Sequence, residues 1–238
     1  ENTISSLGYT IDSGADFAEI DVQETKDGEL VLLHDNSLKR TAGVNKNVWE
    51  MDYAEIEKLD AGSSFHKKFR GEKIPTLDEV LKFCKGRLDL NIEIKYNGKN
   101  KGIVKKVVRV IEQNGFEDHC VITSMNYGFL QQVKKANPNI RTGYIMTMTY
   151  GSISRITAAD FFSVKYTYID EEFVREAHSL GKEVHAWTVN YRGDIKRMID
   201  VGADNIITDN PVLVRKVMNR ESETETGFWE LMKYALRI

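Results

Sequence analysis

The chain has 238 residues, a formal net charge of −3, 41% hydrophobic residues and 29% charged residues. These proportions are ordinary for a soluble globular protein, so they predict a sizeable core and argue against disorder, while the length fits one domain of α/β-barrel size. Lys and Arg are spread along the chain, which argues against a dedicated nucleic-acid surface, and no apolar run approaches the ~20 residues of a membrane-spanning helix.

Apolar runs typical of β-strands alternate with amphipathic runs typical of helices. Strands are expected at residues 17–23, 30–34, 90–95, 121–125, 142–147, 161–166, 184–190 and 205–208. Helices are expected at residues 2–14, 76–85, 102–114, 126–136, 171–180 and 191–201. Strands that alternate with helices require a parallel sheet covered by helices, which is either a barrel or a doubly wound sheet.

One connection breaks this alternation. The segment between the first two strands is too short for a crossover helix, but it suits a hairpin that turns at Asp27-Gly28. The strand at 30–34 is therefore expected to be antiparallel, with His34 opposite Glu19. Seven strands remain for the barrel. An eight-stranded barrel needs one more, and we expect it just upstream of Glu1.

Two segments lie outside the regular pattern. Residues 36–73 show no strong period and are polar, as in an insertion that forms a lid or a substrate wall. Residues 219–238 are acidic through Glu225 and then amphipathic. We divide the chain into a barrel at 1–218 and this tail, whose helix is expected either to pack on the barrel or to contact a membrane surface or a partner.

Charged residues occupy strands that ought to be apolar. Glu19 and Asp21 are two residues apart and share one face of their strand, as do Glu93 and Lys95 on theirs. With His34, these side chains are expected to converge in one barrel mouth. Closely packed carboxylates need a counter-charge, and oxygen ligands favour one Mg²⁺ or Ca²⁺ ion. The alternative is a salt-bridge network without a metal.

Several motifs along almost the whole chain resemble the glycerophosphodiester phosphodiesterase family. They are Glu1-Asn2-Thr3, Gly14-Ala15-Asp16, Glu19-Ile20-Asp21-Val22, Thr25-Lys26-Asp27-Gly28, His34-Asp35, Asp60-Ala61-Gly62, Ile74-Pro75-Thr76-Leu77, Asn91-Ile92-Glu93-Ile94-Lys95, Trp187-Thr188-Val189-Asn190 and Ile207-Thr208-Asp209-Asn210-Pro211, in the order of the family. The resemblance implies a TIM (β/α)₈ barrel that has an inserted hairpin and loop after the early strand, and whose first strand is missing here.

The resemblance also implies roles for individual residues. It implies that Glu19, Asp21 and Glu93 are ligands of one divalent metal. It implies that His34 is one of two catalytic histidines. The substrate contacts that it implies are Lys95, Trp187 and Glu1. The other histidine of the family belongs to a His-Arg-Gly motif that precedes the Glu-Asn-Thr segment. We expect that strand upstream of Glu1, because a barrel without it exposes two open sheet edges, and we expect the chain without it to be impaired.

The implied reaction is the metal-dependent hydrolysis of glycerophosphodiesters to glycerol 3-phosphate and an alcohol. The glycerol hydroxyl attacks first, and water then opens the cyclic phosphate. Two alternatives stay open: release of a lipid headgroup, as by a lysophospholipase D or a sphingomyelinase D, and a non-catalytic binding module. The partners expected are a small-molecule substrate and, through the C-terminal helix, a membrane surface, but no nucleic acid. The compartment stays open; we expect a soluble domain that segments outside this chain could attach to a membrane.

Overall fold

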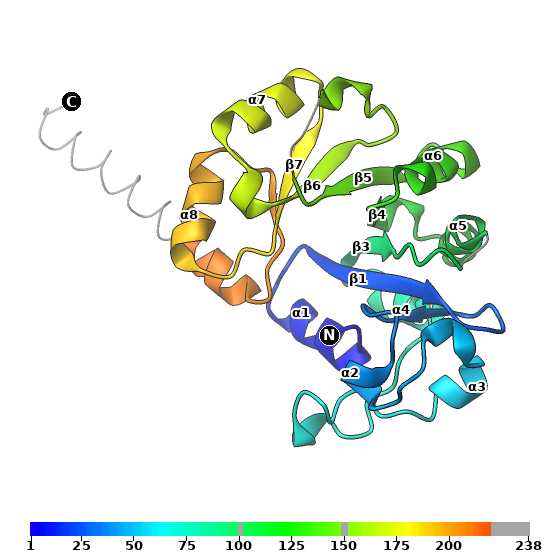
Figure 1. Ribbon diagram of the computed structural model, residues 1–238. Helices are drawn as coiled ribbons and strands as arrows, with labels where there is room; N and C mark the ends of the chain where they lie inside the picture. Colours follow the sequence, from blue (N-terminus) through cyan, green and yellow to red (C-terminus); the bar gives the residue numbers. More distant parts are fainter. Residues whose placement is uncertain (100–101, 149–151, 220–238) are drawn as a thin grey trace, which may run out of the picture.

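The computed structural model describes residues 1–99, 102–148 and 152–219. One curled sheet of eight strands lies at the centre, and the longer helices lie outside it (Figure 1). The strands are β1 (Phe17–Glu24), β2 (Leu30–Leu32), β3 (Asp89–Ile94), β4 (Cys120–Ser124), β5 (Arg141–Met146), β6 (Phe161–Lys165), β7 (Glu183–Trp187) and β8 (Asn205–Ile206). All eight strands expected from the sequence are present.

The longer helices cover the outer face of this sheet. The helices are α1 (Ile4–Asp12), α2 (Lys39–Ala42), α3 (Tyr53–Ile56), α4 (Leu77–Cys84), α5 (Ile103–Asn114), α6 (Tyr127–Ala136), α7 (Glu171–Ser179) and α8 (Arg192–Asp200). The short helices α2 and α3 belong to the insertion at 36–73. Short 3₁₀ turns are η1 (Val48–Glu50), η2 (Lys67–Phe69), η3 (Glu117–His119), η4 (Ile153–Arg155) and η5 (Tyr166–Tyr168). Residues 211–219 are also helical. No helix in the described ranges combines the length and the apolarity needed to cross a bilayer.

The strands follow the order β2-β1-β3-β4-β5-β6-β7-β8. Strand β2 is antiparallel to β1, and every other neighbouring pair is parallel. The expected hairpin is therefore confirmed, but its register was wrong. Leu33, and not His34, reaches the level of Asp21, to whose carbonyl oxygen it donates at 2.9 Å. The turn is wider than expected because Thr25 bonds to Glu29 across it.

The barrel is open on one side. Within the described residues, the sheet ends at β2 and β8, which do not pair with each other, and β2 pairs only with residues 22–24 of β1, so the first part of β1 has no strand partner on that edge. A hollow of about 1760 Å³ lies on that side, lined by residues of α1, β1 and β8. Seven parallel strands and one open side are what a (β/α)₈ barrel without its first strand presents, so the predicted fold class is confirmed.

The insertion at 36–73 differs from its expectation as an irregular loop. It contains α2, η1, α3 and η2, and it has an apolar core of its own formed by Val31, Leu33, Leu38, Val48, Met51, Ile56 and Ile74. The sequence showed no period there because helices of three or four residues are shorter than one repeat of a helical pattern. Strand β2 lies between two cores: Leu30 and Leu32 face the barrel, whereas Val31 and Leu33 face the insertion.

Gly143 on β5 leaves no room for a side chain. A Cβ atom there would lie 2.1 Å from the Phe161 ring, which is fully buried on the neighbouring strand. Gly143→Ala is therefore expected to lower the free energy of unfolding by about 1–3 kcal/mol, the usual cost of overpacking a core. Gly193→Ala is the matched control. It meets no atom within 4 Å on α8, so urea denaturation should show an unchanged or slightly raised stability.

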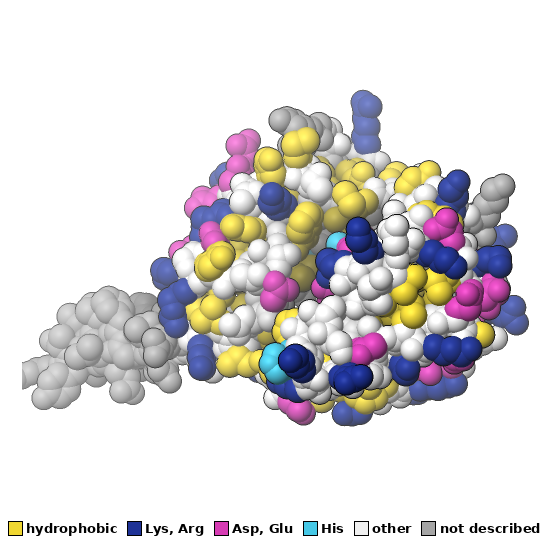
Figure 2. All heavy atoms as spheres, turned by 60° about the horizontal axis from the view of Figure 1, so that its bottom comes forward, with side chains coloured by type: hydrophobic (Ala, Val, Ile, Leu, Met, Phe, Trp, Pro, Cys, Tyr) yellow, Lys and Arg dark blue, Asp and Glu magenta, His cyan; other side chains and the backbone are white. Residues whose placement is uncertain are grey.

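The predicted tail behaviour lies outside the described residues, apart from Asn219 at its start. On the face shown in Figure 2, Lys and Arg side chains are interspersed with Asp and Glu.

Candidate active site

Three carboxylates meet at the inner face of the barrel. Glu19 and Asp21 project from β1 on the same face, and Glu93 follows on β3, where it is the direct register partner of Asp21. One carboxylate oxygen from each residue lies within 4.8 Å of the others. The alternate residues of β1 are buried on the opposite face, in the hydrophobic core between the sheet and the helices; they are Ala18, Ile20 and Val22. The period of the strand thus separates the core from the site.

Lys95 forms ion pairs with two of these carboxylates. Its Nζ lies 2.8 Å from Oδ1 of Asp21 and 3.0 Å from Oε1 of Glu93. Burial lowers the pKa of the Lys95 ammonium, but the two carboxylates outweigh it, so the pKa is raised overall. The convergence of Glu19, Asp21, Glu93 and Lys95 that the sequence predicted is present.

Glu19 is the least compensated carboxylate of the group. Solvent reaches it through the open side of the barrel, yet protein surrounds it elsewhere. This enclosure raises its pKa well above the usual value, and the charges of Asp21 and Glu93 raise it further. Burial likewise raises the pKa of Glu93 despite the nearby Lys95. One ammonium is therefore insufficient for three carboxylates, and a divalent cation would lower the cost of keeping them ionised.

Asn2 is a site residue that sequence reasoning missed. Its Nδ2 donates to Oδ2 of Asp21 at 2.7 Å, and its Oδ1 accepts from the Asp21 backbone N–H at 3.0 Å. Asn2 has a φ of 53° and directly precedes Thr3, the N-cap of α1. The capping box of α1 thus places Asn2 against β1. This contact holds the Asp21 carboxylate in a fixed orientation.

His34 lies just after β2, where its backbone is held from β1. The fully buried Gln23 donates its amide to the carbonyl oxygens of Leu33 at 2.9 Å and Asp35 at 2.7 Å. The His34 side chain is 57% exposed, and its Nδ1 lies 2.8 Å from Oδ1 of Asp35. His34 borders the large hollow, which Glu19 and Asp21 also line.

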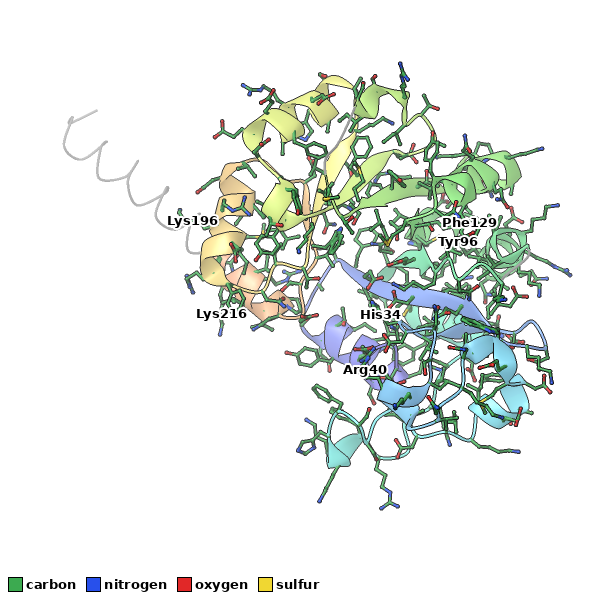
Figure 3. All side chains as sticks on the ribbon, in the orientation of Figure 1. His34, Arg40, Tyr96, Phe129, Lys196 and Lys216 are labelled. Carbon is green, nitrogen blue, oxygen red and sulfur yellow. The ribbon has the colours of Figure 1, made fainter. Side chains whose placement is uncertain are left out.

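A second hollow of about 660 Å³ lies beside the carboxylates. His34, Glu93 and Lys95 line it, together with Tyr96, Met125 and Tyr127. Figure 3 shows Tyr96 beside Phe129, and their rings meet edge to face at 5.6 Å. A volume of this size suits a small organic ligand.

Of the other two predicted substrate contacts, Glu1 lines a hollow that the described residues form beside the carboxylates, and Trp187 does not. Glu1 lines the large hollow and forms an ion pair with Arg40 at 2.5 Å. Trp187 ends β7, is partly buried, and lines neither of the two hollows formed by the described residues. Its indole Nε1 is buried without a hydrogen-bond partner among the described residues.

The other four histidines have partners of their own. His66 accepts the Lys68 backbone N–H at 3.1 Å, and His185 lines the large hollow. His119 pairs with Asp89, and His178 pairs with Asp204. His185 is stacked on Phe161 with ring centroids 4.0 Å apart, and burial lowers its pKa. In the described part of the chain, His34 is therefore the histidine best placed for proton transfer at the carboxylates.

The donor set fits a hard divalent cation. Carboxylate oxygens from two adjacent strands converge, and neither sulfur nor a ring nitrogen belongs to the group. Such ligands favour Mg²⁺ or Ca²⁺ over zinc. A positive charge at this position, next to an ammonium and an exposed imidazole, suits an anionic substrate that exchanges a proton.

Comparisons with known proteins agree with this geometry. The chain matches the model of the glycerophosphoryl diester phosphodiesterase family over residues 1–213. It is 38% identical to a glycerophosphodiester phosphodiesterase of Caldanaerobacter subterraneus, with 91% of this chain and 93% of that protein covered. A solved Oleispira antarctica phosphodiesterase in complex with sn-glycerol-3-phosphate is similar with a TM-score of 0.87 and 26% identity, covering 92% and 91% of the two chains. A human lysophospholipase D is 26% identical, with 93% of this chain and 83% of that protein covered.

Proposed function

This chain belongs to the glycerophosphoryl diester phosphodiesterase family, and we propose that it hydrolyses glycerophosphodiesters to glycerol 3-phosphate and an alcohol with one divalent cation. The observation that carries the proposal is the meeting of Glu19, Asp21 and Glu93, with Lys95 between two of them. The solved relative that binds sn-glycerol-3-phosphate supports the choice of substrate.

Each residue has a distinct task in this proposal. Glu19, Asp21 and Glu93 hold the cation, and Asn2 keeps the Asp21 carboxylate oriented. When bound, the cation supplies positive charge that stabilises the negative charge developing on the phosphoryl oxygens. The Lys95 ammonium adds a fixed charge beside it.

His34 handles the proton. A carboxylate can only accept a hydrogen bond, so the contact with Asp35 places the proton of a neutral His34 on Nδ1. Nε2 is then left to take a proton from a substrate hydroxyl or to return one to the leaving oxygen. The family resemblance assigns the complementary role to the histidine of the His-Arg-Gly strand.

The experiment is a product assay. A chain that carries the family's His-Arg-Gly strand ahead of Glu1 is incubated with glycerophosphocholine, and glycerol 3-phosphate is measured with and without EDTA. Release that EDTA stops and Mg²⁺ or Ca²⁺ restores supports the proposal. Undiminished release in EDTA would contradict the dependence on a metal.

Release of a headgroup from a lysophospholipid is a second candidate. Phe65 and Phe69 of the insertion line the large hollow, with ring centroids 5.8 Å apart, and Phe65 is 80% exposed. An exposed aromatic pair on the wall of a substrate hollow offers a contact for an acyl chain. Most other apolar residues of the insertion are occupied in its own core.

Phe65→Ser separates the two candidates. If the aromatic pair binds an acyl chain, kcat/KM for a long-chain lysophospholipid should fall about tenfold, because burying a Phe side chain contributes about 1.5–3 kcal/mol. The value for glycerophosphocholine should not change. Leu180→Ser, at an exposed position that lines neither hollow, is the control. Equal effects of Phe65→Ser on both substrates would contradict the acyl-chain role.

A further inference from the structure

Arg40 of the insertion forms two hydrogen bonds with the Asp35 carboxylate, which also contacts His34. Its Nε lies 2.7 Å from Oδ2 of Asp35, and its Nη2 lies 3.1 Å from Oδ1 of the same carboxylate. Oδ1 of Asp35 also contacts Nδ1 of His34. The three side chains thus form a continuous chain from α2 to the site, and Figure 3 shows Arg40 and His34 close together below β1.

These two hydrogen bonds have the geometry of a positioning contact. Two parallel N–H···O bonds from one guanidinium fix the plane of a carboxylate, which a Lys ammonium cannot do. The contacts with Arg40 and then with His34 lower the pKa of Asp35 to about 2. Asp35 therefore remains an ionised acceptor throughout the working pH range.

Helix α2 itself is anchored firmly. Leu38 immediately precedes it and is fully buried in the core of the insertion. The helix ends at Gly43, whose φ of 73° is a conformation that favours glycine. The Leu38 N–H donates to the carbonyl of Lys46 at 3.0 Å, which closes the segment on itself. The guanidinium of Arg40 is thus presented from a structured element and not from a free loop.

The same guanidinium reaches the other side of the site. Nη2 of Arg40 also contacts Oε1 of Glu1, and Glu1 directly precedes Asn2, which holds Asp21. Arg40 therefore links the side that carries His34 to the side that carries the carboxylates.

We propose that Arg40 is a positioning residue: it holds the Asp35 carboxylate on Nδ1 of His34, so that Nε2 of His34 faces the substrate in the tautomer that can accept a proton. The insertion then supplies a working part of the site and is more than a covering wall. This inference rests on the proposed role of His34 in proton transfer.

The test compares four variants of the chain that carries the His-Arg-Gly strand, in saturating Mg²⁺. Arg40→Gln removes the positive charge and the paired hydrogen bonds to Asp35. Arg40→Lys keeps the charge but loses the bidentate geometry, and Asp35→Asn removes the negative charge of the acceptor. Lys39→Gln is the matched control, since Lys39 is the exposed neighbour on α2. kcat and KM are measured on glycerophosphocholine, and ¹⁵N NMR reports which ring nitrogen of neutral His34 carries the proton.

The expected results follow from the geometry. Asp35→Asn should lower kcat roughly 100-fold, and Arg40→Gln and Arg40→Lys roughly tenfold or more, with KM nearly unchanged, because orientation of a general acid or base affects the chemical step. The Nδ1-protonated form of His34 should lose population in all three variants and not in the Lys39→Gln control. A merely structural role would lower the melting temperature without moving the tautomer.

Two outcomes overturn separate statements. If Arg40→Gln behaves like Lys39→Gln in kcat and in the tautomer of His34, Arg40 has no positioning role, while the proposed function stands. If His34→Ala itself leaves kcat within tenfold of the parent, the proton-transfer role of His34 fails and the inference fails with it.

Discussion

His34→Ala is expected to lower kcat for glycerophosphodiesters by ~10²–10⁴-fold, the range that a general acid or base contributes. The imidazole is held by Asp35 on one nitrogen and borders the hollow that contains Glu19 and Asp21. Its removal should leave KM similar, because Lys95 and the carboxylates that would hold the phosphate-binding cation remain. Release of glycerol 3-phosphate by the chain that carries the His-Arg-Gly strand is the measurement.

His119→Ala provides the matched control for this prediction. His119 is half exposed and pairs with Asp89 away from the carboxylate group, so its removal should leave kcat unchanged. A loss below tenfold in His34→Ala would remove His34 from the mechanism. A large loss in both variants would point to unfolding, which circular dichroism of each variant reports.

Glu93→Gln is expected to abolish the stabilisation that a divalent cation gives. For the parent chain, Mg²⁺ or Ca²⁺ at about 100 times Kd should add about 2.7 kcal/mol to the free energy of unfolding, which corresponds to a rise in Tm of roughly 5–11 °C. Without the cation, Glu93→Gln should be as stable as the parent or more so, because one of three crowded carboxylates has gone. Activity should fall with the loss of the cation.

Glu112→Gln is the control for the metal experiment. Glu112 lies exposed on α5 and accepts a bond from Asn137, which glutamine can also accept. Its melting temperature should rise with the cation as in the parent. An equal rise in Glu93→Gln would mean that the cation binds elsewhere and that the three carboxylates do not form its site.

The sequence predicted the parts of the fold and site that depend on short-range pattern. A period of two places Glu19 and Asp21 on one face, and strands that alternate with helices fix the parallel sheet, which in turn brings Glu93 beside Asp21. These features need no knowledge of distant contacts. They account for the confirmed strands and for the convergence of the charged residues.

What sequence reasoning missed depends on contacts between distant segments. Asn2 reaches Asp21 across 19 positions, and Arg40 reaches Glu1 across 39. Neither residue stands out in any period. The predicted register of the hairpin was wrong because the register depends on the backbone bond from Thr25 to Glu29 across the turn. The helices of the insertion are too short to leave a helical pattern.

The separate apolar core of the insertion has a consequence for how the protein loses activity on warming. The carboxylates stand on strands of the barrel, whereas the Asp35 and Arg40 side chains that hold the His34 imidazole lie at the start of the insertion, which packs around Val48 and Ile56. Two cores of this kind can open as separate cooperative units. Opening of the smaller unit would release the proton-transfer group and leave the cation ligands assembled. Thermal tolerance of turnover is then set by the insertion, and adaptation to a hotter or colder setting can proceed by substitutions there without altering the metal ligands.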